Sequence, residues 1–365
     1  MSPYDVAIVG TGPDPENPTV ESFAMAYRHA EAYERREDCR LLAAADLVSE
    51  RVETFGDRFE LPTDARFTDA VEMFEAIEPD VVSITVPPEV HTDLVAAAAR
   101  RGVEAIHCEK PMAATWAGAQ RMAQEAWRAD AQLTFHRMRR FGRPFRSATE
   151  LVADGAIGDL RRIEISWGDF YDTGAHAIDL AGMIAGEPRA EWVIAQLDYR
   201  EEDLRFGMHQ ENQMFAQWEY DTGVQAIMAT GEGDGLAGGA FHVVGDDGEI
   251  RIDSDDGPML EVRRAGTATW ETIDIDGEGL HDAGSDEYQY GSVYHQRAID
   301  DVIEALGGDR ESELRARNGL NTAEIIFGGY ESVRRRGRVD FPLTIEDNPF
   351  EAMIESGEIG PDSDN

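Results

Sequence analysis

The organisation of the chain centres on one stretch, Val103-Glu104-Ala105-Ile106-His107-Cys108-Glu109-Lys110-Pro111, in which an apolar run ends in Glu-Lys-Pro. Lys110 is the only lysine of the chain; the other 32 of its 33 lysine and arginine residues are arginines. Arginine is a planar fork, whereas lysine is a compact point donor. The exception therefore favours a chemical role for an ammonium group at this position. Chance survival of a single lysine is the alternative.

Length and composition bound the class of protein. With 365 residues, of which 42% are hydrophobic, the chain is expected to form two domains. No apolar run of about 18 residues occurs, which argues against a membrane span, and the first residues lack the basic segment of a secretory signal. The two cysteines, Cys39 and Cys108, form neither a disulfide framework nor a metal motif and fit a reducing cytoplasm.

The net charge of −40 is extreme, and the acidic residues are spread along the whole chain. It argues against nucleic acid and anionic membrane as partners, because their phosphates would be repelled. An acidic surface almost free of lysine favours adaptation to multimolar cytoplasmic salt, where a Debye length of about 3 Å screens self-repulsion. A halophilic source is therefore expected.

Residues 4–12 predict a strand followed by a glycine-rich turn. Tyr4 to Val9 is an apolar run, Gly10-Thr11-Gly12 follows it, and a helix is expected from about Thr19. Such a turn lets backbone amides approach a pyrophosphate. The loop over 13–18 departs from the G-x-G-x-x-G pattern, so an ordinary strand–turn–helix corner is the alternative.

Asp46 ends the second predicted strand, which covers residues 41–45. An acid at this place binds the ribose hydroxyls of NAD and would repel the 2′-phosphate of NADP. NAD is therefore the expected cofactor, and NADP is less favoured. A helix N-cap is the alternative role of Asp46.

The alternation of strands and helices continues through the Glu-Lys-Pro stretch. Helices are predicted over 70–77 and 91–101, and strands over 81–86 and 103–108. Ligands of open parallel sheets bind beyond the carboxyl ends of the strands. We therefore expect the residues at those ends, Gly10, Asp46, Pro87 and Lys110, on one edge.

Several motifs resemble those of a known family. They are V-x-I-x-V-P-P-x-x-H-x-x-L at residues 82–94, C-E-K-P at 108–111, G-x-I-G-x-L at 155–160 and D-x-G-x-H-x-x-D-L at 172–180. Together they are similar to the glucose–fructose oxidoreductase / inositol dehydrogenase (Gfo/Idh/MocA) family, over nearly the whole chain. The extended first loop is the main departure, and it leaves open which amides hold the pyrophosphate.

The resemblance implies an α/β fold with an N-terminal Rossmann domain, a doubly wound parallel sheet, over residues 1–130. It also implies a C-terminal α+β domain over residues 131–345, whose large, open, mostly antiparallel sheet commonly forms dimer or tetramer contacts. The residues themselves agree. Strands are predicted over 162–167, 192–199, 213–220, 224–230, 240–245, 249–253, 260–264 and 270–275. Hairpin turns at 221–223 and 246–248, a helix over 293–306 and a loosely held acidic tail over 346–365 complete the expectation.

By the same resemblance, Lys110, Asp172 and His176 carry catalysis. Oxidation of an alcohol requires a base for the O–H proton and a cation near the oxygen that gains negative charge. His176 is the expected base, Asp172 orients it or holds a second hydroxyl, and Lys110 donates to the reacting oxygen. A structural histidine and half of a metal site are the alternatives; no metal is expected. Asp179 is expected to anchor its helix.

Other binding residues are expected beside this catalytic set. The cofactor-binding candidates are Gly10, Thr11, Gly12, Asp46, Pro87, His91, Glu109 and Lys110, and the substrate-binding candidates are Arg137, Tyr171 and His295. Five arginines occur within residues 137–146. They predict either a subsite for an anionic group, such as a sugar acid or phosphate, or ion pairs with the acidic surface.

These features predict a cytoplasmic NAD(P)-dependent oxidoreductase. It would transfer a hydride between the nicotinamide and a secondary hydroxyl or ketone of a sugar, polyol or sugar acid, as a homodimer or homotetramer. An NAD-dependent glycosidase of the same family and a non-catalytic nucleotide or sugar sensor are the alternatives. The joint presence of Lys110, Asp172 and His176 argues against the sensor.

Overall fold

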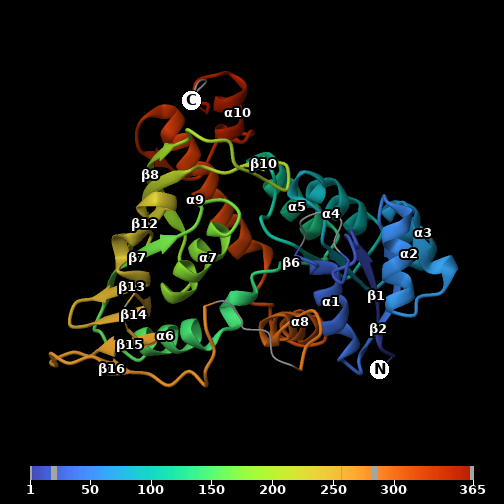
Figure 1. Cartoon of the computed structure of the whole chain (residues 1–365), viewed down its shortest axis with the longest axis horizontal. Helices are drawn as coiled ribbons and strands as arrows, with labels where there is room; N and C mark the ends of the chain where they lie inside the picture. The colour runs from blue at the N-terminus through green and yellow to red at the C-terminus, as the bar shows by residue number, and fades with distance from the viewer. Residues whose placement is uncertain (1, 18–22, 256, 281–286, 362–365) are drawn as a thin grey trace. The chain divides into compact units, whose positions relative to one another are not determined.

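The computed structural model describes residues 2–17, 23–255, 257–280 and 287–361, which belong to two compact units (Figure 1). The first unit comprises residues 1–113, 118–138 and 283–319. The second comprises residues 114–117, 139–282 and 320–365. Among the described helices, none is long and apolar enough to cross a membrane.

The first unit contains a six-stranded sheet in which every neighbouring pair of strands is parallel. The strand order is β3-β2-β1-β4-β5-β6. The strands are β1 Tyr4–Val9, β2 Cys39–Ala45, β3 Arg66–Phe67, β4 Val81–Ile84, β5 Ala105–Cys108 and β6 Gln132–Phe135. The order reverses between β1 and β4, which is the switch point of a doubly wound sheet. The predicted Rossmann architecture is therefore confirmed.

Helices alternate with these strands and bury an apolar core against them. They are α1 Met25–Glu34, α2 Ser49–Arg58, α3 Ala70–Ile77, α4 His91–Arg100, α5 Trp116–Arg128 and α8 Val293–Leu306. Val6 and Ile8 of β1 belong to one core cluster with Tyr27 of α1 and with Ile299 and Ile303 of α8. Helix α8, distant in sequence, thus completes the core of the nucleotide-fold unit.

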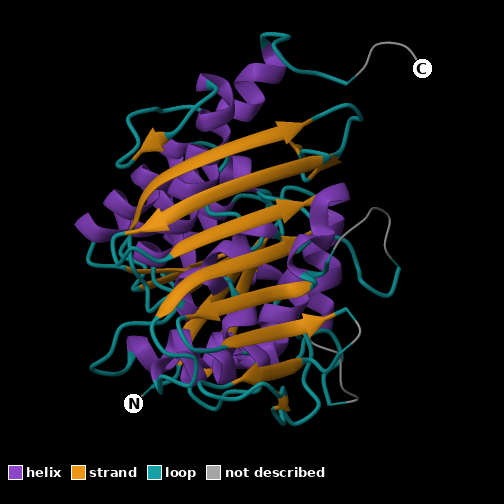
Figure 2. Cartoon of the chain, turned by 90° about the vertical axis from the view of Figure 1, so that its left-hand side faces the viewer, coloured by secondary structure: helices purple, strands orange, loops and turns teal. Residues whose placement is uncertain are grey.

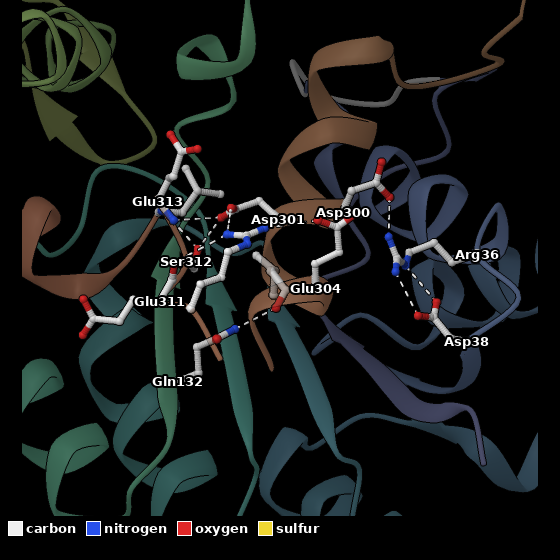
Figure 3. Close-up of polar contacts among 12 residues, drawn as sticks. Arg36, Asp38, Gln132, Asp300, Asp301, Glu304, Glu311, Ser312 and Glu313 are labelled. Carbon is white, nitrogen blue, oxygen red and sulfur yellow. Dashed lines mark hydrogen bonds and ion pairs between the residues drawn. The ribbon is translucent and has the colours of Figure 1, made fainter. Parts of the chain in front are cut away.

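Polar contacts fix the second half of α8 within this unit (Figure 3). Near its middle, the Arg36 guanidinium donates to Asp300 at 2.6 Å. The buried Asp301 carboxylate accepts from the Arg310 side chain at 2.6 Å and from the backbone N–H of Glu313 at 3.0 Å. Gln132 of β6 donates to the Val302 carbonyl at 2.9 Å. These bonds tie α8 to the chain before and after it.

The second unit is built on a nine-stranded sheet of order β16-β15-β14-β13-β7-β12-β11-β8-β17. The pairing is antiparallel except between β7 and β12, which are parallel. The strands are β7 Leu160–Trp167, β8 Ala190–Asp198, β11 Gln213–Tyr220, β12 Gln225–Thr230, β13 Gly239–Gly245, β14 Glu249–Ser254, β15 Leu260–Arg263, β16 Glu271–Thr272 and β17 Val339–Asp340. The expected open, mostly antiparallel sheet is confirmed.

Helices of the second unit pack on one face of this sheet, and Figure 2 shows the strands in front of helices. They are α6 Arg143–Ala153, α7 Gly174–Ile184, α9 Ala316–Arg335, which belongs to this unit from Leu320 on, and α10 Pro349–Glu355. The opposite face carries the alternate side chains of each strand. Ile194 of β8 and Phe215 of β11 are 42% and 46% exposed on it. This face is therefore open along the described strands.

Most predicted elements lie within two residues of the observed bounds, and three of the differences are instructive. Helix α1 begins at Met25, and the expected start at Thr19 lies outside the described residues. The strand predicted to Val86 ends at Ile84. The Thr85 N–H still donates to the Val9 carbonyl at 2.8 Å, and the backbone bends at the next residue. Only Glu271–Thr272 of the run 270–275 pairs with a neighbour.

Two larger expectations about the organisation of the chain differ from the structure. The prediction of a loosely held tail is wrong for its described part, because Asn348 caps α10 and the helix buries Phe350 and Met353. The compact units are also not the two continuous ranges 1–130 and 131–345, because the chain returns to the first unit through α8. Linear periodicity places elements in order but does not say which core an amphipathic helix joins.

Candidate active site

The carboxyl ends of four neighbouring strands form the dinucleotide edge of the first unit. Gly10 follows β1, Asp46 follows β2, Pro87 lies just beyond β4, and Glu109 and Lys110 follow β5. Since β2, β1, β4 and β5 are consecutive neighbours in a parallel sheet, their carboxyl ends meet at one edge. The expectation that these residues share an edge is confirmed by this strand order.

The first loop needs glycine where the chain leaves β1. Gly10 has φ of +87°, and a Cβ there would lie 2.3 Å from Val86 Cγ1 and 3.1 Å from the Val86 nitrogen. Gly12 has φ of +67°. The backbone therefore runs close against the loop after β4, in conformations that favour glycine. This bare backbone is the feature that a pyrophosphate requires for close approach.

The Asp46 carboxylate organises this loop. Its Oδ2 accepts from the Gly12 N–H at 3.0 Å and from the Thr11 hydroxyl at 3.2 Å, and its Oδ1 accepts from the Val48 N–H at 2.9 Å. The N-cap residue of α2 is Val48, without a side-chain bond. Asp46 is therefore not the helix cap that its alternative role required. It stands at the strand end, where a ribose-binding acid is found.

His91 joins the loop after β4 to the segment after Lys110. The imidazole is fully buried, with Nε2 at 2.8 Å from the Val86 carbonyl and Nδ1 at 3.1 Å and 3.2 Å from the carbonyls of Pro111 and Met112. Burial lowers its pKa, against the opposing effect of these carbonyls. His91 thus holds two loops of the dinucleotide edge together and lies beneath that edge.

A chain of buried polar groups ends at the Glu109 carboxylate. Tyr33 and Ser83 share a bond of 3.0 Å, Ser83 Oγ lies 3.1 Å from His29 Nδ1, and His29 Nε2 lies 3.1 Å from Glu109 Oε1. Glu109 Oε2 accepts from the backbone N–H of Lys110 at 3.2 Å. If a neutral His29 donates through Nε2, every donor in this series of hydrogen bonds is directed toward Glu109. The carboxylate therefore fixes the backbone that presents Lys110.

Three buried imidazoles lie beside this chain. Nitrogen atoms of His29, His107 and His136 lie within 4.8 Å of one another, and these residues form the one group among the described residues with metal-ligand spacing. His107 Nδ1 lies 2.8 Å from Thr134 Oγ1, and His107 Nε2 lies 2.9 Å from His136 Nδ1. Both nitrogens of His29 and His107 are thus already bonded within the protein. The prediction of no metal stays a prediction.

Asp172 and His176 lie in the second unit, at the start of α7. Helix α7 begins at Gly174, so Asp172 precedes the helix and His176 lies in its first turn. Their exposures are 3% and 4%. Asp179, farther along, lies 3.4 Å from Arg140 Nε, with both side chains buried, so the anchoring contact expected of Asp179 is present.

The start of α7 depends on a residue that the sequence reasoning missed, Asp169. Its Oδ1 accepts from the N–H of Thr173 at 2.8 Å and from that of Gly174 at 3.3 Å, and its Oδ2 accepts from the Thr173 hydroxyl at 2.5 Å. An aspartate that bonds the first N–H groups of a helix fixes where the helix begins. The signal in the sequence that could have identified it is its position four residues before Thr173, where the segment that forms α7 begins.

Glu211 is a second residue that the sequence gave no reason to single out. It is buried where β11 begins, and it accepts from the Phe170 N–H at 2.7 Å, the Thr230 hydroxyl at 3.1 Å and the Tyr330 hydroxyl at 3.1 Å. Burial, and then the nearby Asp169, raise the pKa of Glu211 to about 7. Glu211 therefore supports the segment that leads to Asp172.

The three substrate-binding candidates differ in their surroundings. His295 is 2% exposed in the first unit, with Nδ1 at 2.5 Å from Ser292 Oγ and its ring stacked on His136. Arg137 is also 2% exposed and donates to the Arg315 carbonyl at 3.3 Å. Tyr171, in the second unit, is 3% exposed. Their roles toward a substrate remain predictions.

Comparison with known proteins gives a consistent result for both parts of the chain. Residues 5–136 match the Gfo/Idh/MocA profile described as "Oxidoreductase family, NAD-binding Rossmann fold". Residues 160–341 match the profile described as "Oxidoreductase family, C-terminal alpha/beta domain". The two matches together cover most of the chain and coincide with the two sheets.

Individual relatives in sequence agree with these profiles. Myo-inositol 2-dehydrogenase of Thermotoga maritima is 30% identical over 174 residues, 44% of this chain and 51% of that protein. The matches with this relative and two others span about half the length of each.

Among solved structures, an NAD-binding oxidoreductase from Klebsiella pneumoniae has a TM-score of 0.74 at 20% identity, covering 94% of this chain and 100% of its own. An oxidoreductase from Agrobacterium radiobacter, in complex with NAD⁺, L-tartaric acid and magnesium, has a TM-score of 0.73 at 20% identity over 93% and 98% of the two chains. At this identity the structures show a shared fold.

Proposed function

Because this chain belongs to the Gfo/Idh/MocA family of oxidoreductases, we propose that it transfers a hydride between NAD and a secondary hydroxyl or ketone of a sugar, polyol or sugar acid. The observation that carries the proposal is the dinucleotide edge. There Gly10, Asp46 and Lys110 end neighbouring strands of a doubly wound parallel sheet. Inositol and apiose dehydrogenases among the relatives support the substrate class.

The dinucleotide edge fits NAD on the geometry of its own residues. The loop of Gly10 and Gly12 leaves no room for a Cβ at Gly10, and the Asp46 carboxylate offers acceptors at the place of a ribose diol. NAD supplies the hydride acceptor or donor when it is bound. Thr11, Pro87, His91 and Glu109 contribute mainly by shaping the two loops of this edge.

The residues of the chain have the following proposed roles in the reaction. His176 accepts the proton of the substrate hydroxyl, since imidazole is a suitable base near neutral pH. Asp172 orients His176 or holds a neighbouring hydroxyl. Lys110 donates to the substrate oxygen as negative charge develops there. Glu109, supported by His29, positions the backbone of Lys110.

The test is a screen of sugars, polyols and sugar acids in multimolar KCl, followed through NADH absorbance. Lys110→Arg keeps the charge but replaces a point donor by a longer planar fork. It is expected to lose most of the turnover, whereas Arg100→Lys, on the exposed surface of α4, is expected to keep it. Near-wild-type turnover of Lys110→Arg would contradict the assigned role.

The same screen separates the two alternative functions. Release of a free sugar without net NADH would identify an NAD-dependent glycosidase. Tight NAD binding without hydride transfer to or from any compound would favour a sensor. No described contact favours either alternative, whereas Asp172 and His176 lie together at the start of α7.

We also propose that the protein assembles as a homodimer or homotetramer through the open face of its nine-stranded sheet. Ile194 and Phe215 are among the large apolar side chains exposed there. Gln217, two residues after Phe215 on β11, lies between Ile194 of β8 and Ile227 of β12 in the strand register. Light scattering with size-exclusion chromatography tests this, and Phe215→Asp is expected to shift the mass toward the monomer.

The cellular setting is likewise a proposal. Cys39 and Cys108 are both free thiols, which suits a reducing cytoplasm. The net charge of −40 supports a halophilic source, because such a surface repels itself unless salt screens it. A melting temperature that does not rise between dilute buffer and multimolar KCl would contradict the halophilic assignment.

A further inference from the structure

The arginine-rich segment, residues 137–146, is not uniform in its contacts. Four of its arginines have partners: Arg137 the Arg315 carbonyl, Arg140 the carboxylates of Asp179 and Glu187, Arg143 that of Asp276, and Arg146 the ring of Phe141. Arg139 instead lies over the ring of Trp167, with its guanidinium carbon 5.0 Å from the centroid. The ion-pair explanation therefore accounts for part of this segment but not for Arg139.

The guanidinium of Arg139 has spare hydrogen-bond donors. Its Nε and Nη1 are shielded from solvent and have no hydrogen-bond partner among the described residues. Burial lowers its pKa to about 10, although Asp169 and Asp172 oppose the change. Arg139 therefore stays protonated at neutral pH. A desolvated donor without an acceptor is unfavourable, and more so when the group is charged.

Arg139 lines a cavity of about 430 Å³ within the second unit. This volume lies within the range of about 300–1,000 Å³ found for small-molecule sites. The buried part of its wall includes Trp167 and Asp169, Thr173 lines it from a half-buried position, and Arg205 lines it from an exposed one. Thr173 directly follows Asp172, so the cavity adjoins the segment that carries the proposed catalytic residues.

The acidic groups of the wall do not neutralise Arg139 through hydrogen bonds. Asp169 is committed to the start of α7 through Thr173 and Gly174 and lies 3.6 Å from Arg205 Nη1. Asp253 and Asp255 line the cavity from half-buried and exposed positions. Arg139, half-buried with Nε and Nη1 shielded from solvent, is therefore the charged group of this wall whose shielded donors still lack an acceptor among the described residues.

We propose that Arg139 binds a carboxylate of the substrate, so that the substrate is a sugar acid rather than a neutral sugar or polyol. This deepens the proposed function and rests on it. A planar guanidinium matches a carboxylate in shape and hydrogen-bonds it strongly. A monoanion suits the site better than a phosphate dianion, because three aspartates also line the cavity. Nη2, the nitrogen that is not shielded, would meet the ligand first.

The test compares matched acidic and neutral compounds on the full-length enzyme in multimolar KCl. D-glucuronate and D-gluconate are compared with D-glucose and myo-inositol, and glucose 6-phosphate is the dianionic probe. The variants are Arg139→Gln, Arg139→Lys and, as the control from the same segment, Arg143→Gln. Two readouts are used: kcat/KM from NADH formation, and the Kd of each compound by calorimetry without NAD.

The wild type is expected to prefer the acids. Arg139→Gln is expected to weaken their binding and kcat/KM by roughly 10- to 100-fold, the worth of a charged hydrogen bond, and to change the neutral compounds by less than about 3-fold. Arg139→Lys should recover part of the loss because it restores the charge, and Arg143→Gln should resemble the wild type.

Each other outcome points to a specific failure. Equal losses for acids and neutral compounds in a folded Arg139→Gln would overturn the subsite, as would tighter binding of glucose 6-phosphate than of glucuronate. NADH formation from neutral polyols, with no effect of Arg139, would overturn the subsite but leave the proposed function intact. Acid binding that depends on Arg139, without NADH formation from any compound, would leave the subsite and overturn the function.

Discussion

The replacement Glu211→Gln is expected to remove most of one pH-dependent contribution to stability. Glu211 is buried and accepts hydrogen bonds from the Phe170 N–H and the hydroxyls of Thr230 and Tyr330. Burial outweighs these donors and, with the nearby Asp169, raises the pKa from 4.5 to about 7. Glutamine has nearly the same shape, can accept from Phe170 through its oxygen, and does not titrate.

The sign of the effect follows from the raised pKa. A group that holds its proton more tightly in the folded state contributes stability that is fully present below the unfolded pKa, here 4.5, and lost as the pH rises through about 7. One pKa unit corresponds to about 1.4 kcal/mol. A rise from 4.5 to about 7 therefore corresponds to about 3 kcal/mol of unfolding free energy, lost across this window.

Urea unfolding at fixed multimolar KCl measures this loss. The wild type, Glu211→Gln and the control Glu201→Gln, which removes an exposed carboxylate, are compared from about pH 5 to pH 8. Other carboxylates titrate alike in all three proteins, so the difference between the wild type and Glu211→Gln isolates the group. That difference is expected to change by about 3 kcal/mol. Parallel curves for these two proteins would refute the reasoning.

Three further predictions concern the dinucleotide edge. Asp46→Asn is expected to raise the Kd of NAD by roughly 10- to 100-fold and that of NADP by less, by calorimetry; tighter binding of NADP than of NAD by the wild type would contradict the ribose role. Gly10→Ala, with its Cβ 2.3 Å from Val86 Cγ1, should lower stability by about 1–3 kcal/mol. Gly102→Ala, where φ is +79° but nothing lies within 4 Å of the added Cβ, should lower stability less when both variants are compared by thermal unfolding. His29→Leu leaves Oε1 of the buried Glu109 carboxylate without its imidazole partner, so it should cost about 2 kcal/mol or more, whereas His29→Gln can keep both bonds of His29; equal losses would argue against the buried hydrogen-bonded series.

The dinucleotide edge was predictable from the sequence because its signals are local. Apolar runs ended by Gly10, Asp46 and Pro87 identify strands, and alternation with helices makes those strands parallel. Parallel strands then place their carboxyl ends together. The distances to Val86 and the three bonds that Asp46 accepts could not be predicted, because they depend on backbone geometry across strands that are far apart in sequence.

The sequence by itself determined the order of the elements, the class of both sheets and the position of Lys110 at a strand end, because periodicity and turn chemistry are properties of neighbouring residues. Only the tertiary structure decided which side chains are buried and what they meet. It placed α8 in the core of the first unit, gave Glu211 its partners from three distant segments, and distinguished Arg139 from four arginines that look equivalent in sequence. Burial and hydrogen-bond partners arise from contacts between segments far apart in the chain. Those contacts decide how much free energy it costs to bury each polar group.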